Sequence, residues 1–148
     1  MSSRAVPPAG AGRSTATGPG RVLVAVYAVF AVSASARAGV QLLRDWHDAP
    51  LAYALSALAA VVYVLATVGL ARGRRRLATT AVAVELIGVL VVGAFSVADP
   101  EAFPRATVWS GFGSGYGYVP LVLPVLGLAW LWRSRRGGAG TQATGTSR

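Results

Sequence analysis

An uncharged apolar run from Leu51 to Ala71 limits the folds open to this chain more than any other feature. The run is as long as the roughly 20 residues that a helix needs to cross the hydrocarbon core of a bilayer. It follows Pro50, and proline suits the first position of a helix because its missing N–H would have no intrahelical partner there. Arg72 ends the run. The sequence therefore predicts a helix here that spans a membrane.

Three further apolar runs extend this prediction to the whole chain. Of the 148 residues, 54% are hydrophobic and 13% are charged, whereas soluble domains carry about 25% charged residues. We predict an all-α fold, a polytopic four-helix transmembrane bundle within residues 21–136. The predicted spans are about 22–44, 51–71, 77–98 and 112–132. The segments 1–20 and 137–148 are rich in Gly, Ser, Thr and Ala and are predicted to be disordered tails.

The arginines predict an orientation for the bundle. Eleven of the 14 basic residues, all of which are Arg, fall in the two tails, at the flanking span ends or between the second and third spans. They are Arg4, Arg13, Arg21, Arg72, Arg74, Arg75, Arg76, Arg133, Arg135, Arg136 and Arg148. Since cytoplasmic loops carry the excess of positive charge, both termini are predicted to be cytoplasmic. Trp46 and Trp109 at the outer boundary, and Trp130 and Trp132 at the inner one, fit aromatic belts.

The first span has an alternative interpretation. A cleavable signal peptide also fits Arg4 and Arg13, the apolar stretch from Val22, and a cleavage motif at Ala34-Ser35-Ala36 or Ala36-Arg37-Ala38. Cleavage would leave three spans and place the new N-terminus outside.

Glu85 is the most informative polar residue. It interrupts the third apolar run about 12 Å of helix rise from Leu77, near mid-depth. An ionisable group at that depth normally faces a partner or a wet cavity. We predict an intramembrane polar cluster of Glu85 with Arg37, Tyr53 and Tyr63, either as a Glu85–Arg37 pair or as a hydrogen bond from one of the tyrosines.

The glycine-rich segment from Gly111 to Tyr118 precedes the fourth apolar run. Gly111, Gly113, Gly115 and Gly117 form two small-xxx-small pairs, which favour close helix contact. The alternative is a loop or a loosely wound helix start, because Pro120 and Pro124 limit helical regularity.

Little in the sequence points to catalysis. The chain has one His and no Cys, so no catalytic, cofactor or metal site is predicted. Arginines clustered at span ends serve topology rather than nucleic acid. The predicted partners are the lipid bilayer and a second copy or another membrane protein. We expect a structural or interaction component of the cell membrane, and the alternative is a small oligomeric proton-coupled transporter that uses Glu85.

Two stretches carry a resemblance to known proteins. One is Ala49-Pro50-Leu51-Ala52-Tyr53 and its continuation to Ala60, and the other runs from Thr107-Val108-Trp109 through the glycines to Pro124. Together they resemble small actinobacterial integral membrane proteins that have four predicted spans and no assigned function. The resemblance covers about residues 21–133 and implies a bacterial inner membrane. It supplies no functional residues.

Overall fold

The computed structural model describes residues 18–139, and within that range the chain is all-α with no strand. The expectation of disordered tails falls on residues 1–17 and 140–148, which lie outside the described residues, while Pro19, Gly20 and 137–139 are helical. The elements are α1 (Pro19–Arg44), α2 (Pro50–Ala71), α3 (Arg75–Ala98), η1 (Pro100–Ala102), η2 (Ser110–Tyr116) and α4 (Val119–Ala139).

The first three helices agree closely with the predicted spans. They begin one to three residues before the predicted starts at 22, 51 and 77 and end where expected, at Arg44, Ala71 and Ala98. Proline occupies the first turn of α1 and α2, where its fixed φ favours helix. All three helices are long and apolar enough to cross a membrane.

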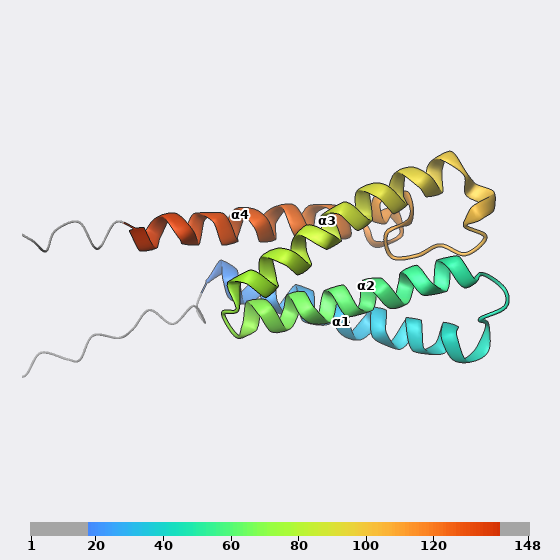
Figure 1. Cartoon of the computed structure of the whole chain (residues 1–148), viewed down its shortest axis with the longest axis horizontal. Coiled ribbons are helices and arrows are strands. Elements are labelled where there is room, and N and C mark those ends of the chain that lie inside the picture. The colour runs from blue at the N-terminus through green and yellow to red at the C-terminus, as the bar shows by residue number, and fades with distance from the viewer. Residues whose placement is uncertain (1–17, 140–148) are drawn as a thin grey trace, which may run out of the picture.

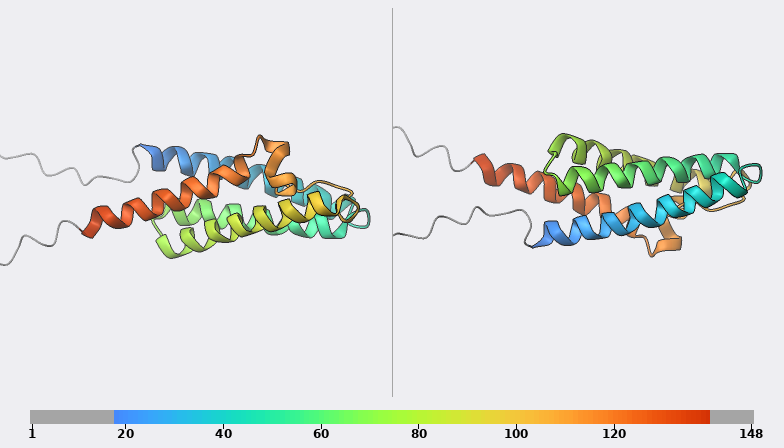
Figure 2. Two further views of the ribbon diagram at one scale, coloured as in Figure 1. Left: turned by 90° about the horizontal axis from the view of Figure 1, so that it is seen from above. Right: turned by 90° about the horizontal axis from the view of Figure 1, so that it is seen from below.

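The helices form an elongated bundle in which each packs along the next. α1 lies on α2, α2 on α3 and α3 on α4 (Figure 1), while α1 and α4 touch little. The starts of α1 and α3 and the ends of α2 and α4 gather at one end of the bundle, which we call the arginine end. Both views in Figure 2 show the same grouping. The α1–α2 loop and the end of α3 lie at the opposite end, which we call the loop end.

Most of the core runs along the length of the bundle. Its fully or nearly buried members include Tyr27, Tyr63, Val82, Val89 and Trp109. The outward faces of the four helices are mostly apolar as well, although Arg37 is exposed on α1. Their exposed side chains include Val32, Leu43, Val61, Ile87, Val97 and Leu126. A soluble monomer rarely exposes so continuous an apolar surface.

The glycine-rich segment differs from the predicted helix start at residue 112. Phe112 and Tyr118 have positive φ values of 58° and 60°, so no continuous α-helix can pass through them. α4 therefore begins at Val119, and η2 is bent from it by 99°. Residues 18–139 thus contain three candidate spans, or four if the bent pair counts as one.

The four predicted packing glycines serve this turn rather than a helix–helix contact. Gly111, Gly113 and Gly117 have positive φ, and a Cβ added to Gly113 would lie 2.8 Å from the ring of Pro120. A Cβ at Gly115 or Gly117 would meet nothing within 4 Å. Only Gly113 therefore needs its lack of a side chain for packing against α4.

Candidate functional site

The candidate site is built around Glu85, which projects from α3 into the core and is fully buried. Its Oε2 atom accepts a hydrogen bond of 2.6 Å from the hydroxyl of Tyr27 on α1. The two residues are 58 positions apart in the sequence. This bond ties together α1 and α3, which flank α2 on either side.

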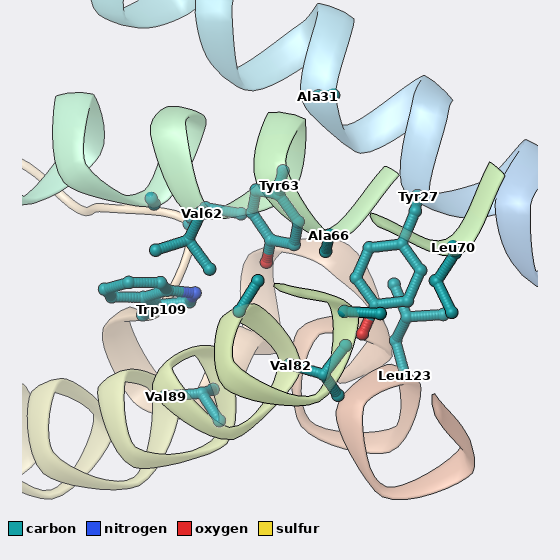
Figure 3. Packing of buried hydrophobic residues seen from close by; sticks show 14 of the residues in the cluster. Tyr27, Ala31, Val62, Tyr63, Ala66, Leu70, Val82, Val89, Trp109 and Leu123 are labelled. Carbon is teal, nitrogen blue, oxygen red and sulfur yellow. The ribbon is translucent and has the colours of Figure 1, made fainter. Parts of the chain in front are cut away.

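Two more polar groups approach the same carboxyl group. The hydroxyl of Tyr63 on α2 lies near Glu85 and near the indole of Trp109, and Figure 3 shows the Tyr63 hydroxyl and the Trp109 nitrogen directed into the space between α2 and α3. Neither group reaches hydrogen-bonding geometry: Tyr63 OH, Trp109 Nε1 and Glu85 Oε1 are buried without a partner. We call Tyr27, Tyr63, Glu85 and Trp109 the Glu85 cluster.

Aromatic and small residues shape the walls of this cluster. The rings of Tyr27 and Tyr63 have centroids 6.3 Å apart, and the Phe30 ring packs against Tyr63 in a tilted arrangement with centroids 5.4 Å apart. A Cβ added to Gly88 would lie 2.7 Å from the Trp109 ring. One added to Gly127 on α4 would lie 3.3 Å from the Tyr27 hydroxyl. The Trp109 ring and the Tyr27 hydroxyl therefore fit only because small residues face them.

The structure brings together two of the four predicted site residues, Glu85 and Tyr63. Arg37 lies elsewhere: it donates to the hydroxyl of Tyr116 and, at 2.9 Å, to the carbonyl oxygen of Ala106. The predicted Glu85–Arg37 pair does not form. Tyr53 is buried with Ala49 and Ala52 in a separate cluster and makes no hydrogen bond with Glu85.

Sequence reasoning missed Tyr27 and Trp109. Trp109 was expected in an outer aromatic belt, but only 1% of it is exposed, because the α3–α4 loop folds back over Gly88. Tyr27 had a usable signal in its depth. Tyr27 lies about 7.5 Å of helix rise from Val22, and Arg37 lies about 22 Å from it. The depth of Glu85, about 12 Å from Leu77, is therefore closer to that of Tyr27 than to that of Arg37.

The Glu85 cluster lies within packed side chains of the core. Glu85 has no exposed surface, and five cavities along the described helices are lined by other residues. Within residues 18–139, no three His, Asp or Glu side chains gather as metal ligands would. The cluster is thus a buried, partly satisfied hydrogen-bonding site in contact with three helices and one loop.

No family model, curated protein or solved structure matches this chain. The resemblance to small actinobacterial membrane proteins therefore stays a prediction.

Proposed function

We propose that this chain is a multi-pass protein of the bacterial cytoplasmic membrane with four crossings and both termini in the cytoplasm. Three long apolar helices and the bent η2–α4 pair supply the crossings. Their exposed faces are apolar, as contact with lipid requires. We count η2 and α4 as one broken span because both ends of the described chain lie at the arginine end (Figure 1). Two ends on one side of a membrane require an even number of crossings.

The charge distribution supports the orientation. Arg72, Arg74, Arg75 and Arg76 lie in or beside the exposed α2–α3 turn at the arginine end. The positive-inside rule assigns that end to the cytoplasm. Trp132 at this end is 62% exposed and carries Arg136 over its ring at 4.7 Å, an arrangement suited to a headgroup layer.

The orientation can be tested by labelling single cysteines, since the natural chain has none. His47→Cys in the α1–α2 loop and Ala71→Cys at the end of α2 are both exposed positions. In spheroplasts, a membrane-impermeant maleimide should label His47→Cys at once and Ala71→Cys only after permeabilisation. The reverse pattern would overturn the orientation, and equal labelling would contradict the four crossings.

We further propose that the protein has no catalytic activity and acts as a structural or interaction component of the membrane. The single observation behind this role is that Glu85 is fully buried in the core, where it is hydrogen-bonded to Tyr27. Its partners are the surrounding lipid and, through the exposed apolar faces, a second copy or another membrane protein.

A small proton-coupled transporter is the second candidate. The observation that favours it is the unused hydrogen-bonding capacity of Glu85 Oε1, Tyr63 OH and Trp109 Nε1 in the middle of the bundle. Of these groups, the Glu85 carboxyl and the Tyr63 hydroxyl could pass a proton if the helices separated enough to admit water.

Proton flux into proteoliposomes that contain a pH-sensitive dye tests whether Glu85 passes protons across the membrane. A potassium gradient with valinomycin supplies the driving force. The structural role predicts the same flux with the protein as with empty liposomes. The transporter predicts flux that Glu85→Gln abolishes and that Glu101→Gln, an exposed acid at the loop end, leaves unchanged.

A further inference from the structure

Arg37 has hydrogen-bonding capacity and charge that the described protein does not use. A guanidinium carries five N–H donors, and only two hydrogen bonds are formed, to the neutral oxygens of Tyr116 and Ala106. No carboxylate within residues 18–139 forms an ion pair with it. A full positive charge on a membrane helix without an acidic partner favours an external anion.

An apolar cavity of about 140 Å³ lies beside Arg37, between α1, the α3–α4 connection and Ser56 of α2. Phe30, Ala34 and Val108 contribute to its walls. Val29 lines it too and is 64% exposed on the outer flank of α1. This cavity therefore borders the surface that we assign to lipid.

A second cavity of about 460 Å³ meets the first at Arg37 and Tyr116, which line both. Besides Tyr116, its walls carry hydroxyl groups from four side chains of α3 and the α3–α4 connection. These are Ser96, Thr107, Ser110 and Ser114. A cationic group thus stands at the junction of an apolar cavity and a hydroxyl-lined one.

We propose that Arg37 and these two cavities bind one anionic glycerophospholipid. The phosphate accepts hydrogen bonds from Arg37, a hydroxylated headgroup lies in the larger cavity, and the upper part of one acyl chain enters the smaller one. The depth agrees with this placement. Arg37 is about 22 Å of helix rise from Val22, where the apolar run begins, so it lies in the outer third of a core about 30 Å thick. The site rests on the proposed membrane placement.

Native mass spectrometry of the full chain in detergent tests the site directly. The probes are dioleoyl phosphatidylglycerol and dioleoyl phosphatidylcholine, which have the same acyl chains, and glycerol phosphate, which has none. We expect phosphatidylglycerol to bind more tightly than phosphatidylcholine. Competition by glycerol phosphate at concentrations equal to the lipid would overturn the lipid assignment in favour of a free anion.

Two variants and a control tie the binding to the site. Arg37→Gln should weaken phosphatidylglycerol binding about 10- to 100-fold, which is the change in affinity that corresponds to the loss of one charge-assisted hydrogen bond. Arg44→Gln, on the same helix but lining neither cavity, should leave it unchanged. Ala34→Leu fills the apolar cavity without altering charge and should weaken binding of both lipids. Wild-type selectivity in Arg37→Gln would refute the proposal. The detergent measurement does not depend on orientation, so this result and a failure of the cysteine-labelling test are distinguishable.

Discussion

Tyr27→Phe and Tyr63→Phe form a matched pair that tests the Glu85 cluster. Each change removes one hydroxyl and keeps a buried ring beside the same carboxyl group. The Tyr27 hydroxyl makes a 2.6 Å hydrogen bond to Glu85. The Tyr63 hydroxyl makes none. The two variants therefore differ in whether a hydrogen bond is lost.

The expected magnitudes follow from this difference. Tyr27→Phe leaves the buried Glu85 without any hydrogen bond, because its other oxygen is already unpartnered. Such a loss costs about 1–3 kcal/mol in proteins generally, and measured pairs in membranes reach about 1.7 kcal/mol. We expect a cost of about 1–2 kcal/mol. Tyr63→Phe removes an unsatisfied buried hydroxyl and should change the free energy of unfolding by less than about 0.5 kcal/mol.

Titration with sodium dodecyl sulfate in mixed micelles, followed by far-ultraviolet circular dichroism, gives the free energies of unfolding. A Glu85→Leu background supplies the control, because without the carboxyl acceptor Tyr27→Phe should cost little. Glu85→Gln keeps an acceptor oxygen, so in that background Tyr27→Phe should stay costly. Equal costs for the two tyrosine variants would refute the hydrogen bond as the stabilising contact. The same conclusion would follow if the cost of Tyr27→Phe persisted with Leu at position 85.

Two substitutions test the close approaches around the cluster and the turn. Gly88→Ala should destabilise the bundle by about 1–3 kcal/mol and shift the fluorescence of Trp109, whose rigid ring lies 2.7 Å from the added Cβ; Gly39→Ala, with nothing within 4 Å, should be neutral or stabilising. Gly113→Ala should cost at least about 1 kcal/mol because of its positive φ and the nearby Pro120, measured in the same titration, and Gly115→Ala should cost nothing. A neutral Gly113→Ala would contradict the η2 geometry.

Local sequence signals predicted the helices well where those signals are strong. Pro50 and Arg72 bound an uncharged run, and Asp99-Pro100 ends the third helix, so the ends of these helices could be read directly. The start of α4 could not. The residues that break it include Phe112 and Tyr118, which adopt left-handed backbone although their side chains do not favour it. Only the packing of the turn against α3 and α4 imposes that conformation.

The candidate site, like the helices, could be predicted only where local sequence is enough and not where distant segments pack together. Its place in the middle of the third apolar run singled out Glu85 in the sequence, and in the structure Glu85 is fully buried. Its partner depends on how α1 is rotated and how deep it lies relative to α3, which periodicity on one helix cannot supply. The burial of Trp109 depends on a loop that folds inward, and helical periodicity cannot predict the path of a loop.

The late start of α4 has a consequence for the membrane itself. From Val119 to Trp132 its apolar length is about 21 Å, against a hydrocarbon core of about 30 Å, whereas α2 and α3 match the core in full. In the proposed membrane placement, the protein has a hydrophobic mismatch on one flank only. Lipids beside α4 must thin locally or give way to a neighbouring protein. This flank is therefore where clustering with other short-spanned proteins would relieve the most bilayer deformation.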